Sequence, residues 1–279
     1  MSSERIGVVT DSAADIPSSL LEKYSIRMIP NILVIGNRTY EDGIQISREE
    51  FYAGLPKMNP LPTTATPSIF SFQQVYQNLF AEGVSHIISI HAASRLSGIF
   101  DTASSAALSF GERVRVIDSQ FLSMGLGFQV LEAAEAAIRG EALEEVVRRT
   151  EDARSRARVV AMLDTLDYVR RSGRVSWAKA QIGNLLRLKP FVRVSEGKVF
   201  SLGEVRTRKK GIDRLIELIL REGPLQRLAI LHTNAEFDAK TVLLELKPIV
   251  PTEPLIINVT SIIGTHVGPN GLGFAGLVA

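Results

Sequence analysis

Short apolar runs alternate with stretches of helical periodicity along the first half of the chain. Runs of four to six mostly apolar residues are typical of buried strands, and they occur at residues 6–10, 87–90 and 114–118. Apolar side chains recur every three or four positions over residues 69–80, as expected for a helix packed on a core. This alternation predicts a doubly wound α/β domain with a mainly parallel sheet.

The second half of the chain also alternates, with one difference. Apolar runs at residues 191–194 and 198–202 flank Glu196-Gly197, which predicts an antiparallel hairpin and therefore a mixed sheet. A helix is expected through Trp177, Ile182 and Leu186. The charged residues 142–158 predict an exposed helix that links two domains. We therefore expect an N-terminal α/β domain over residues 1–157 and a C-terminal one over residues 158–279.

Polar loops follow several of the predicted strands. Asp11-Ser12, Ser94 to Gly98 and Asp118-Ser119 all fall at carboxyl ends of strands, where ligands bind in open α/β sheets. Ser97 and Gly98 precede a helix, and the free N–H groups of a helix N-terminus favour an anion. An ordinary helix cap is the alternative interpretation of this loop.

Two other segments are candidate parts of a site. Residues 60–68 hold three prolines and several hydroxyls, which predicts a rigid loop that presents Thr64 and ends at Ser68 as a helix N-cap. Residues 264–273 form a glycine-rich connection between two predicted strands and carry Thr265 and His266. Plain turns would account for both segments equally well.

Composition excludes several classes of function. The 279 residues contain no cysteine, and their four histidines show no metal-ligand spacing, so no metal site is expected. Neither a Rossmann glycine pattern nor a phosphate-binding loop occurs, so no cofactor is expected. A net charge of +2 argues against nucleic acid as a partner. The N-terminus has no signal-peptide pattern and no apolar run is long enough to span a bilayer, so we expect a cytoplasmic protein without stable membrane insertion.

The remaining chemistry suits a small anion. Hydroxyls and one imidazole can bind a carboxylate, but Ser97 could also act as a nucleophile with His266 and either Asp11 or Asp118. The alternative function is thus a hydrolase or phosphotransferase acting on a small anionic substrate. The arginine-rich residues 170–174 and 206–210 suit either a solvated surface or docking of an acidic partner.

Taken together, the motifs resemble the DegV family of bacterial fatty-acid-binding proteins. The resemblance extends over essentially the whole chain, through ordered motifs that include Thr10 to Pro17, Thr64 to Ser68, Ser94 to Gly98, Val116 to Ser119, Ser172 to Val175, Val205 to Lys210 and Thr265 to Pro269. This chain departs from the family pattern at Ala65, Thr66 and Ile99, where Ser, Gln and Thr are usual, and at Ala93, where the family loop carries a second serine.

The resemblance implies a carrier and not an enzyme. One long-chain fatty acid would be buried between the two domains, with its carboxylate at Thr64, Ser97, Gly98, Thr265 and His266. A separate fatty acid kinase would then phosphorylate the presented carboxylate. Arg174 and Arg206 match the positions that suggest kinase docking or phosphate handling.

Overall fold

The N-terminal half of the chain builds a four-stranded parallel sheet. The computed structural model describes residues 4–175, 178, 188–246 and 254–279. The strand order is β2-β1-β6-β7, with bounds β1 (Ile6–Asp11), β2 (Arg27–Ile29), β6 (His86–His91) and β7 (Val114–Asp118). Each apolar run predicted as a strand here is confirmed, and all neighbouring strands are parallel.

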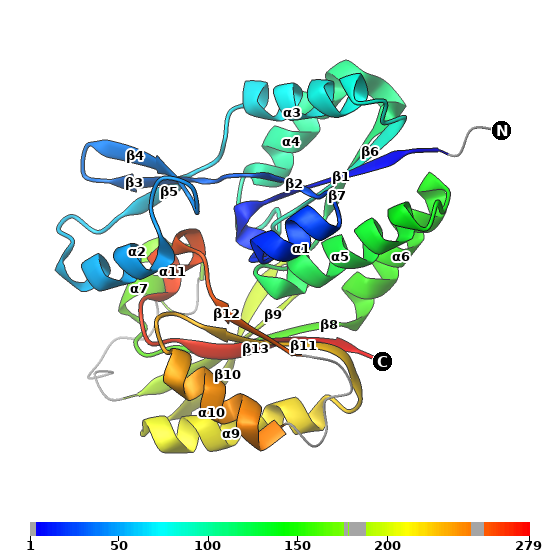
Figure 1. Cartoon of the computed structure of the whole chain (residues 1–279). Coiled ribbons are helices and arrows are strands. Elements are labelled where there is room, and N and C mark those ends of the chain that lie inside the picture. The colour runs from blue at the N-terminus through cyan, green and yellow to red at the C-terminus, as the bar shows by residue number, and fades with distance from the viewer. Residues whose placement is uncertain (1–3, 176–177, 179–187, 247–253) are drawn as a thin grey trace.

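Helices cover both faces of this sheet, as a doubly wound fold requires (Figure 1). Helices α3 (Ile69–Ala81) and α4 (Ile99–Ala107) lie on one face. The other face carries α1 (Ser18–Lys23) and α5 (Met124–Ile138), and α6 (Leu143–Arg156) packs against α5. The described residues of this half also include the 3-10 turns η1 (Ser12–Ala14), η2 (Leu55–Lys57) and η3 (Leu108–Arg113).

The C-terminal half builds a six-stranded mixed sheet of order β10-β9-β8-β13-β11-β12. Its strands are β8 (Ala157–Met162), β9 (Lys189–Ser195), β10 (Lys198–Val205), β11 (Leu225–His232), β12 (Leu255–Asn258) and β13 (Leu272–Val278). Only the β11–β12 pair among these described neighbours is parallel. The predicted hairpin is confirmed, since β9 and β10 pair antiparallel on either side of Glu196 and Gly197, whose positive φ angles of 53° and 70° suit a tight turn.

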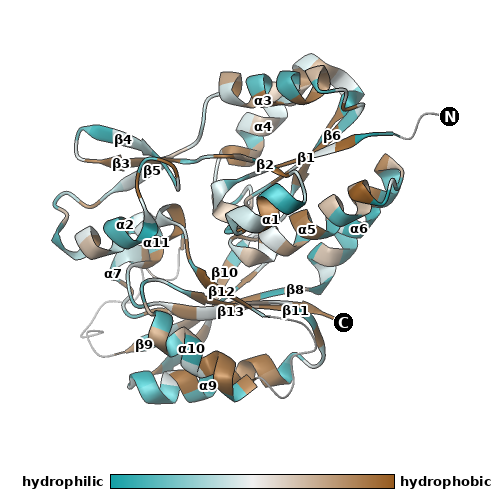
Figure 2. Cartoon of the chain, in the orientation of Figure 1, coloured by the Kyte–Doolittle hydropathy of each residue, from teal (hydrophilic) through white to brown (hydrophobic). Residues whose placement is uncertain are grey.

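Helix α5 lies between the two sheets, and α9 (Arg208–Arg221) and α10 (Glu236–Leu246) cover the far face of the mixed sheet (Figure 1). Helix α5 contacts β1 on one side and β8 and β13 on the other. Strands of both sheets are mostly hydrophobic, whereas polar residues mark outer helices such as α1, α2 and α6 (Figure 2). Two sheets thus share one buried helix, which brings the carboxyl end of the parallel sheet over the mixed sheet.

A third, unpredicted sheet flanks the two large ones. It has the order β4-β3-β5, with β3 (Ile32–Ile35), β4 (Arg38–Glu41) and β5 (Thr63–Ala65) all antiparallel. Helix α2 (Arg48–Gly54) begins at a capping box formed by Ser47 and Glu50. Helices α7 (Asp167–Ser172) and α11 (Ser261–Val267) contact each other, and α11 also contacts α2. A separate core of Leu33, Phe51, Tyr52, Leu55 and Ile262 joins these pieces.

Three expectations from the sequence were wrong. The charged residues 142–158 do contain the predicted helix, but one of its faces is not exposed, because Leu143, Val146, Thr150 and Ala153 recur at helical spacing and pack α6 against α5; its role as a link between two domains stays a prediction. Part of the predicted loop 60–68 is strand β5, which pairs with β3. Part of the predicted loop 264–273 is the last turn of α11.

The division into domains at residues 157 and 158 stays a prediction. This boundary falls at the first residues of β8, where the chain enters the mixed sheet. The helix expected through Trp177, Ile182 and Leu186 lies outside the described residues.

Candidate ligand-binding site

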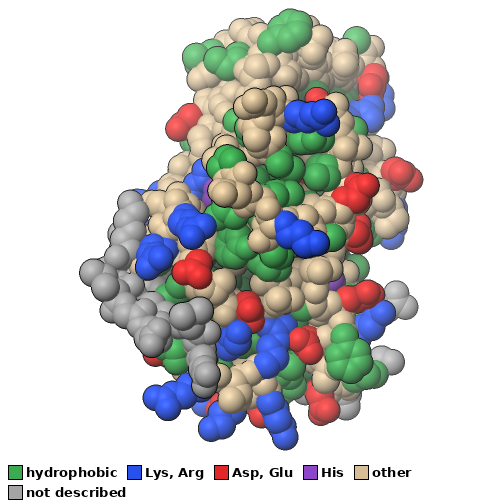
Figure 3. All heavy atoms as spheres, turned by 90° about the vertical axis from the view of Figure 1, so that its left-hand side faces the viewer, with side chains coloured by type: hydrophobic (Ala, Val, Ile, Leu, Met, Phe, Trp, Pro, Cys, Tyr) green, Lys and Arg blue, Asp and Glu red, His purple; other side chains and the backbone are tan. Residues whose placement is uncertain are grey.

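A cavity of about 200 Å³ lies where the parallel sheet faces the mixed sheet. Its walls are mainly small and branched apolar side chains from both halves of the chain, among them Ala13, Ala92, Leu96, Val159, Leu163, Val192, Leu231 and Ile262. On the face shown in Figure 3, hydrophobic side chains form a central band bordered by Lys and Arg side chains. The apolar walls of the cavity exclude water and offer no hydrogen bonds, so they suit an apolar chain.

Polar groups from four distant segments meet in the lining of this cavity. Thr64 comes from β5, Ser97 and Gly98 from the loop before α4, Arg174 from the segment after α7, and His266 from α11. Four of these five residues were predicted as ligand contacts, and Arg174 was predicted as a docking residue. The structure brings all five to one cavity.

The imidazole of His266 connects two of these groups. Its Nε2 atom lies 3.0 Å from the Thr64 hydroxyl oxygen and also accepts a hydrogen bond from Nη1 of Arg174. A guanidinium can only donate, so Nε2 carries no proton in this arrangement. Burial, and then the charge of Arg174, lower the pKa of His266 from 6.5 to about 3, so the ring is neutral at physiological pH. Nε2 is therefore an acceptor, and the single ring proton lies on Nδ1.

At the cavity wall, Ser97 provides a hydrogen-bond donor and Gly98 provides space for a ligand. The Ser97 oxygen accepts the Ile99 N–H at 3.3 Å, so its own proton is available to another acceptor. Gly98 has an ordinary φ of −75°, and an added Cβ would meet only Thr66 Cγ2, at 3.8 Å. Neither backbone conformation nor packing therefore requires glycine at this position.

Thr265 does not line the cavity, although it precedes His266. The side chain is buried, and its hydroxyl donates to the Ser261 carbonyl at 2.8 Å within α11. Its hydroxyl proton is thus used inside the helix. We leave Thr265 out of the site.

The two predicted docking arginines lie in different places. Arg174 has an exposed residue surface, yet it reaches into the cavity, and burial of the guanidinium lowers its pKa. Arg206 is exposed, directly after β10, and is not part of the cavity lining. Spacing along the sequence gave no signal that Arg174 would meet His266.

The catalytic triad considered from the sequence does not form. Asp11 accepts from Nδ1 of a different histidine, His91, at 3.0 Å, and both side chains are fully buried. Asp118 accepts from the Ser94 hydroxyl at 2.6 Å. These carboxylates fix the loops after β1 and β6 and do not orient His266. Within the described part of the chain, no cluster of three acidic or histidine side chains could hold a metal ion.

Comparison with known proteins identifies the relatives of this chain. The family model described as "Uncharacterised protein, DegV family" matches residues 5–277. Protein DegV of Bacillus subtilis is 35% identical over 275 residues, which cover 96% of this chain and 97% of the relative. No helix in the described residues is long and apolar enough to cross a bilayer.

Solved structures of the family have the same fold. A structure titled "Fatty Acid Binding of a DegV family Protein from Thermus thermophilus" matches with a TM-score of 0.90 at 30% identity, covering 99% of this chain and 100% of that one. The B. subtilis DegV structure, titled a fatty acid binding protein, matches with a TM-score of 0.87 at 34% identity, covering 99% and 100%. The chain belongs to the DegV family.

Proposed function

We propose that this protein binds one long-chain fatty acid in the cavity, with the carboxylate at the polar end. The observation that carries the proposal is the composition of the wall: a largely apolar lining with Thr64, Ser97, Gly98, Arg174 and His266 in it. Burying an apolar chain against such walls lowers its free energy. Its carboxylate would be costly to bury without donors.

The donors free to meet a carboxylate at the polar end are the Arg174 guanidinium and the Ser97 hydroxyl, because the Thr64 proton is directed to Nε2 of His266. Arg174 has five N–H groups, so it can keep its bond to His266 and still bind a carboxylate oxygen. The Ser97 proton is available, and Gly98 lets the ligand approach the backbone. His266 is neutral, so Arg174 is the cation at this end of the cavity. Nε2 of His266 accepts hydrogen bonds from Thr64 and Arg174 and so orients both side chains. The Thermus thermophilus and Bacillus subtilis relatives, both described as binding fatty acids, support this assignment.

We further propose that the bound carboxylate is presented to a separate fatty acid kinase, with Arg174 and Arg206 as contacts for the kinase or the phosphate. The exposed positions of these arginines support the proposal. In this role the chain supplies no catalytic residue of its own.

A displacement assay separates the carrier from the enzyme considered earlier. The delipidated protein is loaded with a fluorescent fatty acid and titrated with palmitate, and in parallel it is given acyl and phosphate esters. A carrier shows stoichiometric displacement without ester turnover. Ester turnover that is lost in Ser97→Ala and His266→Ala would instead support a hydrolase or phosphotransferase.

A further inference from the structure

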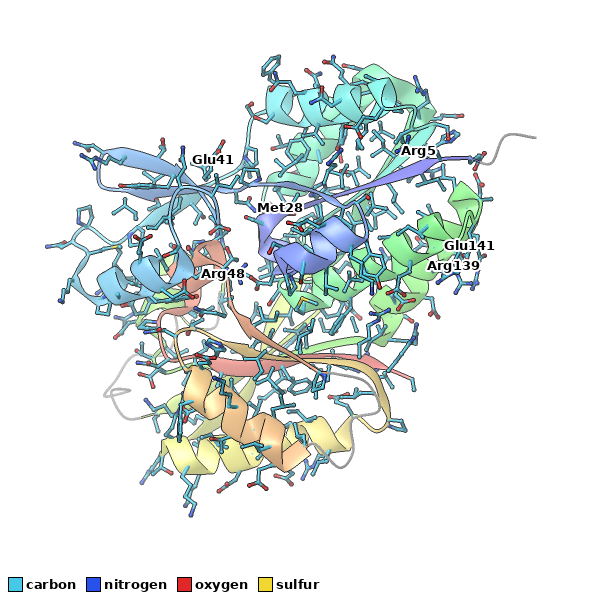
Figure 4. The ribbon with its side chains drawn as sticks, in the orientation of Figure 1. Arg5, Met28, Glu41, Arg48, Arg139 and Glu141 are labelled. Carbon is cyan, nitrogen blue, oxygen red and sulfur yellow. The ribbon has the colours of Figure 1, made fainter. Side chains whose placement is uncertain are left out.

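In the segment that joins β12 to α11, residues 258–260, four side chains from the N-terminal part of the chain bond the backbone or the Thr260 hydroxyl. Arg48 donates to the Asn258 carbonyl, and the Tyr52 hydroxyl donates to the Val259 carbonyl at 2.9 Å. The Thr260 N–H donates to Asp15 at 2.8 Å, and the Thr260 hydroxyl donates to Asp42. We call these four side chains (Asp15, Asp42, Arg48 and Tyr52) the clamp. Arg48 is labelled in Figure 4, beside α2 and α11.

The clamp is buried and charged. Asp15, Asp42 and Tyr52 are each at most 2% exposed, and Thr260 is fully buried. Among the described residues, the cation paired with a clamp carboxylate is Arg48, whose Nη2 lies 3.4 Å from Asp15. Two carboxylates in such a place are costly compared with apolar side chains, whereas hydrogen bonds to them fix position and direction. The arrangement therefore favours a defined geometry over maximal stability.

The geometry that the clamp fixes is that of α11. Thr260 is the N-cap of this helix, and His266 lies in its last turn. A Cβ on Gly264 would come within 2.3 Å of the Tyr52 hydroxyl, so α11 rests directly on α2. Asp15 also accepts from the Ser123 hydroxyl at 2.6 Å, and Ser123 lines the cavity. One carboxylate thus ties the cavity wall to the helix that carries His266.

We propose that Asp15, Asp42, Tyr52 and Thr260 are positioning residues that set His266 against Thr64 and so determine how tightly the fatty acid carboxylate is held. This inference rests on the proposed function. It goes beyond it by assigning a binding role to buried groups that do not touch the ligand's carboxylate.

The test compares Thr260→Val with Thr260→Ser in the full-length protein. Valine keeps the shape and the backbone N–H but removes the hydroxyl, whereas serine keeps the hydroxyl. Thr150→Val is the matched control, because Thr150 is equally buried and its hydroxyl donates to a carbonyl within α6. Two quantities are measured: affinity for a fluorescent fatty acid, and the ring ¹⁵N signals of His266, assigned with His266→Gln.

We expect Thr260→Val to weaken binding about fivefold, because α11 loses a bond of roughly 1 kcal/mol that holds it in the binding geometry, and to shift the His266 ring signals. Thr260→Ser should restore both to wild-type values, and Thr150→Val should lower only the melting temperature. If Thr260→Val does not fold, Tyr52→Phe removes the bond to Val259 and should act in the same direction. The inference is overturned if the folded Thr260→Val or Tyr52→Phe variant leaves affinity and ring signals unchanged. If the wild-type protein binds no fatty acid, the proposed function fails, while the ring signals still decide whether the clamp positions His266.

Discussion

The Thr64 hydroxyl oxygen lies 3.0 Å from Nε2 of His266, although the two residues are 202 positions apart in the chain. Thr64 lies in a three-residue strand of the small sheet, and His266 lies in a seven-residue helix near the C-terminus. Their contact joins the N-terminal and C-terminal halves of the chain at the cavity.

Removing either hydroxyl of the polar end should weaken fatty acid binding. We expect Ser97→Ala to lower affinity about tenfold, since hydrogen bonds to a charged group contribute roughly 1.5–3 kcal/mol. Thr64→Val should lower it by less, because the Thr64 hydroxyl donates to His266 and acts on the carboxylate through that ring. Displacement of a fluorescent fatty acid measures the change. Thr241→Val is the control, because its hydroxyl donates to a carbonyl within α10, away from the cavity. Unchanged affinity in both variants would remove these residues from the site.

A methyl group at Gly98 should reduce binding without reducing stability. The backbone there is ordinary and the added Cβ would find only van der Waals contact. Gly98→Ala should therefore leave the free energy of unfolding equal or raise it by about 0.5 kcal/mol. Affinity should fall, because the methyl group occupies the space that the carboxylate approaches. Denaturant unfolding and the displacement assay, run on the same sample, check both parts; wild-type affinity would show that no ligand approaches Gly98.

The two arginines should differ in what they affect. Arg174→Gln should lower affinity for the fatty acid by about tenfold or more, with a smaller effect on the uncharged methyl ester. Arg206→Gln should leave fatty acid affinity unchanged and lower acyl-phosphate formation in the presence of a fatty acid kinase. Equal affinity losses for acid and ester in Arg174→Gln would mean that its charge does not meet the carboxylate.

The neutral state of His266 has a consequence for acid stability. Its folded pKa of about 3 lies below the ordinary 6.5, so between these values the unfolded chain binds more protons than the folded one. The stability that depends on neutral His266 is present above about pH 6.5 and is lost as the pH falls towards 3. Between pH 7 and pH 4 the wild type should lose about 2 kcal/mol more free energy of unfolding than His266→Gln, after allowance for the partly exposed ring. Urea unfolding at both pH values measures this difference, and equal losses would contradict a buried neutral imidazole.

Sequence patterns predicted most of the two large sheets, because strands such as β6 and β7 are continuous apolar runs and helices such as α3 repeat at helical spacing. They did not predict β5, whose hydroxyl-rich residues form a strand only through pairing with β3. Helix α11 was also missed. Gly264, Gly268 and Pro269 are typical of a loop, whereas the helix depends on its Thr260 cap and its packing on Tyr52.

The site was predictable only in part. Hydroxyls, a glycine and an imidazole could be picked out as anion ligands by residue type. Their convergence depends on packing between distant segments, which spacing does not encode. The same holds for Arg174: its sequence neighbourhood is typical of a solvated surface, and only the fold places its guanidinium on His266.

Mass spectrometry of the purified protein tests the central claim most directly. Native spectra give the mass of any bound molecule, and extraction with organic solvent identifies it. We predict one long-chain fatty acid per chain, and loss of that mass in the combined Thr64→Val, Ser97→Ala, Arg174→Gln variant. A protein that carries no fatty acid, and that takes up none when palmitate is added after delipidation, would contradict the account.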